Sequence, residues 1–221
     1  MKGINLLGSG GICRIAMDIL RNYPSEYYID NIYDDAREKY NTLFNNVLIT
    51  GTINEYVNSD LSNHSLYFNC LGNINAFNAR IRYSKYLRNK GAQSVNITHP
   101  NCFVSKESII GTGNLICSFV TIDANANIGN ENIICSHTVI EHDTKIGDLC
   151  YLSPSSTICG KVILEDHVYI GPGAILTAGV KIGNNSIVGA GSVVLKDIPE
   201  NSVYVGTPAR FLKTNNLWGK K

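Results

Sequence analysis

The sequence predicts two units of different build, a small α/β unit over residues 1–95 and a triangular parallel β-solenoid over residues 96–200. Two observations carry this prediction. From residue 104 onward every sixth residue is aliphatic, for sixteen consecutive positions. The first 95 residues lack that period and instead alternate strand-like and helix-like segments, which favours a parallel sheet with helices. Residues 201–221 follow the last repeat and are expected to cap the open end of the solenoid.

The segments of the α/β unit are predicted in order from their apolar patterns. Residues 3–11 form an apolar strand that ends in a glycine turn, and residues 13–23 have the spacing of an amphipathic helix. Residues 26–35 predict a second strand that ends in two aspartates. Residues 65–73 predict a third strand, and residues 76–91 a helix closed by its final glycine.

The period of six fits neither the 3.6-residue repeat of a helix nor the two-residue alternation of a plain strand. It suits a short strand and a tight corner, so that three such units close one coil of 18 residues. Side chains four positions after each aliphatic residue are mostly small or β-branched, which predicts a second inward position. Glycines recur directly after the aliphatic residue, and we expect them to stack on one corner where positive φ is needed: Gly111, Gly129, Gly147 and Gly183.

Charge and cysteine content narrow the class of protein. Nineteen basic residues stand against 18 acidic ones, so the sequence offers no overall attraction for nucleic acid or an anionic membrane. The seven cysteines include no CxxC pair, which favours reduced thiols and a cytoplasmic protein. The sequence also shows no signal-peptide pattern at its start and no apolar run of about 18 residues for a membrane span.

His142 is the main candidate for catalysis. Residues 18 apart should lie one above another, which places Ala124, Gly160 and Ala178 in its column and leaves room beside the imidazole for an extended ligand. A histidine can take a proton from a nucleophile at neutral pH, and an adjacent carboxylate can orient it. The backbone N–H of Gly160 could stabilise the oxyanion that forms on a thioester. A plainer reading makes Glu141 and Asp143 solvated corner residues.

The repeat resembles that of the bacterial hexapeptide-repeat sugar acetyltransferases, in which an aliphatic residue is followed by Gly, Ala, Glu or Asp, two free positions and a small residue. The resemblance to the branch that acetylates nucleotide-linked amino sugars or sialic acids covers the whole chain. It implies a left-handed parallel β-helix, with His142 as the catalytic base and Asp143 as its acidic partner. Many relatives have glutamate at that second position, so whether Glu141 helps instead stays open.

The function that the resemblance implies is acetyl-CoA-dependent N-acetylation of a UDP-, dTDP- or GDP-linked 4-amino sugar, of the kind used in surface polysaccharide biosynthesis. Its expected partners are acetyl-CoA, the nucleotide sugar and two further copies of the chain, in a homotrimer with active sites between subunits. No metal is expected. The coenzyme is expected at small residues of the solenoid and at cations of the tail, where Arg210 and Lys213 could pair with phosphates: Gly160, Ala178, Ala190, Arg210 and Lys213.

The glycine turn at residues 8–11 follows a strand and opens a helix, which is the setting in which backbone N–H groups bind phosphate. Cys13 stands where the third glycine of a dinucleotide fingerprint would be, so the motif is weak, and a purely structural turn is an equal alternative. The resemblance implies that this unit binds the nucleotide of the sugar. The expected substrate-binding residues are Gly8, Ser9, Gly10, Gly11, Asp34, Asp35, Gly72 and Asn73.

Three other functions compete with this one. One is a non-catalytic nucleotide-sugar binder, for which replacing His142 would leave function intact. A sialic acid O-acetyltransferase would use the same base on a hydroxyl group. A γ-class carbonic anhydrase shares the solenoid and binds zinc through paired histidines, for which His137 and His142 are candidates. Asn101 stands two coils before His137, where the third ligand is needed, and His99 misses the register. His137 is therefore expected to be a pocket wall or a surface residue.

Overall fold

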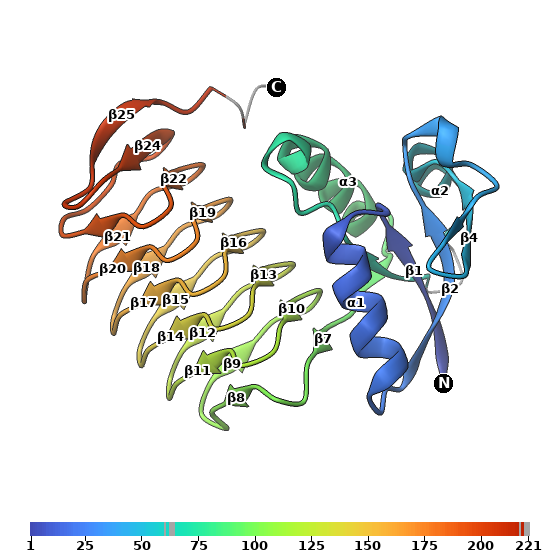
Figure 1. Cartoon of the computed structure of the whole chain (residues 1–221), viewed down its shortest axis with the longest axis horizontal. Coiled ribbons are helices and arrows are strands. Elements are labelled where there is room, and N and C mark those ends of the chain that lie inside the picture. The colour runs from blue at the N-terminus through green and yellow to red at the C-terminus, as the bar shows by residue number, and fades with distance from the viewer. Residues whose placement is uncertain (60, 62–64, 217, 219–221) are drawn as a thin grey trace. The chain divides into compact units, whose positions relative to one another are not determined.

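The structure is a computed structural model, and it describes residues 1–59, 61, 65–216 and 218. The chain divides into two compact units, Met1–Ile97 and Thr98–Lys221. The first unit holds the helices and one sheet of mixed direction, and the second holds a stack of short strands (Figure 1).

The sheet of the first unit has the order β3-β4-β2-β1-β5-β6. All its neighbouring pairs are parallel except β3 with β4, which form an antiparallel hairpin. The chain moves outward from β1 to β4 and then returns to the other side of β1 at β5, so the strand order reverses between β1 and β5. The strands are β1 (Lys2–Leu7), β2 (Tyr27–Tyr33), β3 (Leu43–Phe44), β4 (Val47–Gly51), β5 (Leu66–Asn69) and β6 (Gln93–Ser94).

In the described part of this unit, three α-helices and two short 3-10 helices accompany the sheet: α1 (Gly11–Asn22), α2 (Ile53–Asn58), α3 (Phe77–Asn89), η1 (Arg37–Lys39) and η2 (Ile74–Ala76). The predicted helices correspond to α1 and α3, and Gly91 follows α3 with a φ of +77°, as a closing glycine should. The prediction missed the β3–β4 hairpin and α2. The signal for α2 was present, because Thr52 and Glu55 form a capping box at its start.

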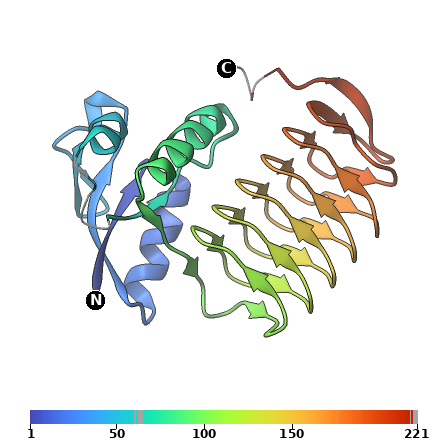
Figure 2. The same ribbon diagram turned by 180° about the vertical axis from the view of Figure 1, so that it is seen from behind.

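The second unit is a three-sided solenoid, and its coils are stacked in chain order in Figures 1 and 2. Sixteen two-residue strands, β8 to β23, each end at one of the periodic aliphatic residues. They pair in parallel with a register of 18 residues; Val139 lies opposite Thr157, for example. The predicted coil length is therefore confirmed.

Each side of the solenoid is named here after its first strand. The β7 side contains β7 (Ile97–Thr98), β10 (Leu115–Ile116), β13 (Ile133–Ile134), β16 (Tyr151–Leu152), β19 (Tyr169–Ile170), β22 (Ile187–Val188), β24 (Ser202–Val205) and β25 (Arg210–Thr214). The β8 side contains β8 (Phe103–Val104), β11 (Thr121–Ile122), β14 (Val139–Ile140), β17 (Thr157–Ile158), β20 (Ile175–Leu176) and β23 (Val193–Val194). The β9 side contains β9 (Ile109–Ile110), β12 (Asn127–Ile128), β15 (Lys145–Ile146), β18 (Ile163–Leu164) and β21 (Lys181–Ile182).

The interior of the solenoid is filled by the two predicted sets of side chains. From Ile116 to Val194 every periodic aliphatic residue is buried. The second inward position is also buried throughout, with Ala126, Thr144 and Ser156 at 0% exposure. Small side chains there leave room for the aliphatic residues of the three sides to meet in one core.

The expectation of positive φ at the four corner glycines is wrong. The left-handed conformation recurs every six residues from Gly113 to Gly191, three positions after the aliphatic residue, and its occupants include Phe119, His137 and Asp143. The glycines are needed instead because a side chain would clash with the next coil. A Cβ on Gly129 would lie 2.5 Å from Asp148 Oδ1 and 2.6 Å from the Gly147 carbonyl oxygen.

That space accommodates a ladder of side chains on the corner between the β9 and β7 sides. The backbone N–H groups of residues 112, 130, 148 and 166 each donate to the Oδ1 atom of the side chain one coil later, at 2.8–3.0 Å. We call this column the Asx ladder; its acceptors are Asn130, Asp148, Asp166 and Asn184. The ladder satisfies corner N–H groups that the strands themselves cannot pair.

Candidate active site

His142 lies on the corner between β14 and β15, which we call the His142 corner (residues 141–144). Ile140 before it and Thr144 after it are both buried, whereas His142 and Asp143 between them are exposed and Glu141 is half-buried. The register puts His142 one coil before Gly160, as expected, and the Lys161 N–H donates to the His142 carbonyl oxygen at 3.0 Å. The repeat therefore fixes the backbone under the imidazole.

Asp143 is the acidic partner that the imidazole meets. Its Oδ2 lies 2.9 Å from His142 Nδ1, and the two side chains are 44% and 57% exposed. The φ of +57° at Asp143 allows adjacent side chains to turn toward each other. The hydrogen bond to His142 lowers the pKa of Asp143, and Asn125 and Lys161, which flank it on adjacent coils, add to the effect. With Nδ1 directed at the carboxylate, Nε2 is the nitrogen left to face a substrate.

Gly160 forms the surface against which the ring lies. A Cβ built on Gly160 would come within 2.8 Å of His142 Cε1 and Nε2, so a glycine is needed for this position of the imidazole. The expected oxyanion role of its N–H meets an obstacle, because that N–H donates to Glu141 Oε2 at 2.7 Å. Glu141 is thus directed at the Gly160 amide rather than at His142.

The other expected coenzyme residues of the solenoid lie in two different columns. Ala178 continues the column of His142 and Gly160, and it is exposed. Ala190 is also exposed but follows β22, on the corner between the β7 and β8 sides, so the register does not align it with Gly160. The structure brings Gly160 and Ala178 together and separates Ala190 from them.

His137 stands at the other end of β14, on the corner between the β7 and β8 sides. Its ring stacks on Phe119, one coil earlier, with 5.0 Å between ring centroids and an interplanar angle of 19°. His167 Nδ1 pairs with Asn185 Oδ1 at 3.1 Å on the third corner. Within the described part of the chain, no cluster of three or more His, Cys, Asp or Glu side chains could hold a metal ion.

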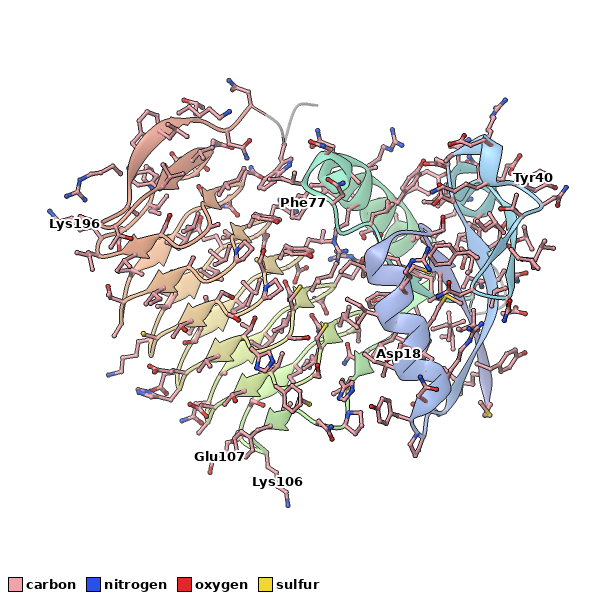
Figure 3. All side chains as sticks on the ribbon, in the orientation of Figure 1. Asp18, Tyr40, Phe77, Lys106, Glu107 and Lys196 are labelled. Atoms are coloured by element: carbon pink, nitrogen blue, oxygen red, sulfur yellow. The ribbon has the colours of Figure 1, made fainter. Side chains whose placement is uncertain are left out.

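The tail folds back as an antiparallel hairpin of β24 and β25 that extends the β7 side. A cavity of about 540 Å³ lies between this hairpin and the loop after β23. Its lining includes Arg210, Lys196 and two aromatic rings, Tyr204 and Phe211, which meet edge to face. Figure 3 shows Lys196 at the end of the solenoid opposite Lys106 and Glu107. Lys213 is exposed on the same strand as Arg210.

The glycine turn of the first unit is braced by Asp34. Ser9 donates to Asp34 Oδ2 through both its N–H and its hydroxyl, and Ala36 N–H donates to Oδ1. Burial alone would raise the pKa of Asp34, but the hydrogen bonds from Ser9, Ala36 and Lys39 outweigh it and lower that pKa. Gly8 has a φ of +98° and lies against Leu71, whereas Gly10 and Gly11 are exposed with open space beside them.

Lys39 is a site residue that the sequence analysis missed. Its Nζ lies 3.2 Å from both Ser9 Oγ and Asp34 Oδ2, and its side chain is 42% exposed. A 3-10 helix carries it back to the turn, and nothing in the spacing indicates that return. Lys39 places a cation beside the first turn of α1, where an anionic group could bind.

The remaining predicted substrate residues have structural partners. Asp35 accepts the N–H of Asn54 at 3.2 Å and the hydroxyl of Tyr83 at 2.6 Å, so its carboxylate joins α2 to α3. Asn73 caps η2 by accepting the N–H of Asn75. Gly72 and Asn73 follow β5, across the reversal point from the glycine turn that follows β1.

Comparisons of sequence and of structure both relate this chain to proteins with hexapeptide repeats. A family model described as bacterial transferase hexapeptide (six repeats) matches residues 161–196. The structure of PerB from Caulobacter crescentus, in complex with CoA and GDP-perosamine, has a TM-score of 0.83 and 28% identity and covers 96% of this chain and 98% of that one. Residues 161–196 therefore match the repeat of the bacterial hexapeptide transferases, and the chain shares the fold of PerB over nearly its whole length. No curated protein matches its sequence.

Two further structures resemble this chain over nearly its whole length. WeeI from Acinetobacter baumannii AYE has a TM-score of 0.81 and 26% identity, and it covers 96% of this chain and 100% of that one. The acetyltransferase domain of PglB from Neisseria gonorrhoeae FA1090 has a TM-score of 0.83 at 22% identity and covers 96% and 100%, which supports the fold alone. These neighbours confirm the predicted left-handed β-helix with an α/β unit and the predicted relationship to acyltransferases. Among the described residues no helix is long and apolar enough to cross a membrane.

Proposed function

We propose that this protein moves the acetyl group of acetyl-CoA onto the amine of a nucleotide-linked 4-amino sugar. The observation that carries the proposal is the pair formed by His142 and Asp143, held at 2.9 Å above Gly160 in a transferase fold. The PerB structure supports the substrate class, because that protein was crystallised with CoA and GDP-perosamine.

The chemistry follows from the orientation of the ring. Nδ1 of His142 donates to Asp143, which leaves the Nε2 lone pair to accept a proton from the sugar amine as that amine attacks the thioester carbonyl. Asp143 stabilises the imidazolium that forms. The tetrahedral intermediate then collapses with loss of the coenzyme thiolate, so no acyl-enzyme is required. The Gly160 amide is the backbone donor proposed for the oxyanion once Glu141 has released it.

Acetyl-CoA is proposed to reach the His142 corner along the column of Gly160 and Ala178. The cavity at the tail fits the other end of the coenzyme, because Arg210 and Lys196 supply positive charge for phosphates and Tyr204 and Phe211 supply apolar surface for a base. Lys213 adds a third cation on β25.

The nucleotide of the acceptor is proposed to bind the first unit at the glycine turn, Gly8 to Gly11. Asp34 braces this turn, and Lys39 and the exposed amides of Gly10 and Gly11 offer a cation and donors for phosphate. Gly72 and Asn73 flank the same reversal point, at which open α/β sheets bind ligands.

A homotrimer is proposed from the outward surface of the β8 side. Its outward residues are apolar or β-branched in every coil: Phe103, Thr121, Val139, Thr157, Ile175 and Val193. The β9 side is mixed, since its outward residues are two isoleucines and three polar or charged residues: Ile109, Asn127, Lys145, Ile163 and Lys181. Desolvating the β8 side costs less, so a second copy fits there, next to the His142 corner. Sedimentation equilibrium should give three times the chain mass of 24.2 kDa.

The test is release of free thiol from acetyl-CoA with a panel of acceptors. We expect turnover with one or more UDP-, dTDP- or GDP-linked 4-amino sugars and none with the matched 4-hydroxy sugars. The competing function, O-acetylation of a sialic acid, predicts turnover with free sialic acid or CMP-sialic acid instead. Turnover with neither set would contradict the proposal.

A further inference from the structure

The Gly160 N–H forms a hydrogen bond with a side chain of the same chain. This N–H donates to Glu141 Oε2 at 2.7 Å, and the ring of His142 lies over the Gly160 α-carbon. The Glu141 charge also reaches the neighbouring thiol, because burial and this carboxylate together raise the pKa of Cys159. A carboxylate oxygen therefore sits where the proposed reaction needs the carbonyl oxygen of the thioester.

We propose that Glu141 holds the place of the acetyl carbonyl oxygen and is displaced from the Gly160 amide when acetyl-CoA binds. One N–H cannot donate a good hydrogen bond to two oxygens at once, and two negative oxygens on one amide repel each other. The proposal rests on the proposed function, since it concerns the same oxyanion donor. It makes Glu141 a determinant of how strongly the enzyme prefers acetyl-CoA to CoA.

A second glutamate in the solenoid, Glu165, also accepts a backbone N–H and is held in place by more partners than Glu141. Glu165 reaches an amide 19 residues later, as Glu141 does, and its Oε2 accepts both the N–H and the side-chain amide of Asn184. Its other oxygen pairs with Lys181 at 2.5 Å. Glu165 is thus held by three groups.

Glu141 is held less firmly than Glu165. Among the described residues its side chain accepts a single hydrogen bond, the one from Gly160. It is also only half-buried, so water can solvate the carboxylate when it leaves the amide. Displacing Glu141 therefore breaks one hydrogen bond, whereas displacing Glu165 breaks two and an ion pair.

The experiment compares two ligands that differ only in the acetyl group. Isothermal titration without acceptor gives the dissociation constants of CoA and acetyl-CoA for the wild type, Glu141→Gln, Glu141→Ala and Glu165→Ala. CoA has no carbonyl oxygen to place on the Gly160 amide, so the ratio of the two constants isolates that contact. Glu165→Ala is the matched control, because Glu165 also accepts the N–H of the residue 19 positions later but does not lie beside His142.

We expect Glu141→Ala to shift the ratio in favour of acetyl-CoA by roughly threefold to tenfold, the range for a half-exposed, charge-assisted hydrogen bond. Glu141→Gln keeps a neutral acceptor on the amide and should fall between the wild type and Glu141→Ala. Glu165→Ala should leave the ratio unchanged. Thermal unfolding of each variant verifies that the protein titrated is folded.

An unchanged ratio in Glu141→Ala would overturn the inference while leaving the proposed function intact, because the wild type would still bind acetyl-CoA. A ratio shifted toward CoA would overturn it as well, since it would make Glu141 part of the binding surface rather than a competitor. Failure of the wild type to bind either ligand would overturn the proposed function and this inference together.

Discussion

Two corner columns of the solenoid share one place in the repeat and differ in what they carry. The Asx ladder fills one column with side chains whose Oδ1 atoms bond the backbone of the preceding coil. The column of the His142 corner holds Ala124, His142, Gly160 and Ala178. In the Asx ladder every side chain is used to join coils, so none is available for catalysis. In the column of the His142 corner three of the four residues are small, so the imidazole of His142 is exposed beside Gly160.

The comparison has an energetic side. An inward-facing or coil-joining residue is stabilised by neighbours on both sides, whereas the His142 side chain is 57% exposed and, among the described residues, hydrogen-bonds only to Asp143. Replacing His142 should therefore affect the reaction and not the fold, and replacing a ladder residue should do the reverse. The following predictions test that contrast, starting from the largest effect.

His142→Ala should lower kcat by about 10²- to 10⁴-fold, the usual contribution of a general base, with no change in thermal unfolding. Thiol release from acetyl-CoA measures the rate. His167→Ala is the control, because His167 lies on another corner and bonds Asn185. A His142→Ala enzyme with full activity would show that the imidazole is only a surface group.

Gly160→Ala should lower kcat roughly 10- to 100-fold, because a methyl group 2.8 Å from His142 Cε1 and Nε2 forces the ring out of position. The φ of Gly160 lies outside the left-handed region, so alanine itself is tolerated by the backbone. Steady-state kinetics measure the loss, and Ala178→Gly serves as a control that frees space in the same column. Unchanged kinetics for Gly160→Ala would mean that the reaction does not depend on the position that the His142 ring has in the structure.

Asp143→Asn should lower kcat about tenfold in steady-state kinetics. The imidazole loses the carboxylate that orients it and that stabilises the imidazolium formed during the reaction. In the wild type the pKa of Asp143 is lowered, so its carboxylate is lost only as the pH falls through that lowered value. From ordinary carboxyl pKa values upward it is ionised, and it does not shape the pH–rate profile near neutrality. A kcat unchanged by Asp143→Asn would contradict the role of Asp143 as the partner of His142.

Asp148→Ala should destabilise the fold by about 1–3 kcal/mol while leaving kcat unchanged, because it removes the acceptor of the Asn130 amide. Urea unfolding measures the free energy. Asp148→Asn keeps an Oδ1 atom and should retain most of the stability, as Asn130 and Asn184 do at equivalent positions. A loss of activity without a loss of stability in Asp148→Ala would contradict the structural role assigned to the Asx ladder.

The sequence period predicted the coil length and the inward positions of the solenoid, because each coil repeats the same requirement for an aliphatic side chain. The same reasoning placed His142 above Gly160 and next to Asp143. It failed where the outcome depends on a side-chain rotamer: the spacing did not indicate that Glu141 turns to the Gly160 amide, or that Lys39 returns to the glycine turn. It also misplaced positive φ, because Phe119 and His137 carry no sequence mark of a left-handed backbone.

The central claim is that the His142 corner presents an imidazole whose Nε2 is free to take a proton. The most direct measurement is the tautomer of His142 by nitrogen-15 NMR of histidine-labelled protein, with its signals assigned by their loss in His142→Ala. We predict that the neutral ring carries its proton on Nδ1, directed at Asp143, with Nε2 unprotonated. A neutral ring protonated on Nε2 would contradict the claim, because the nitrogen that faces the substrate could then accept no proton.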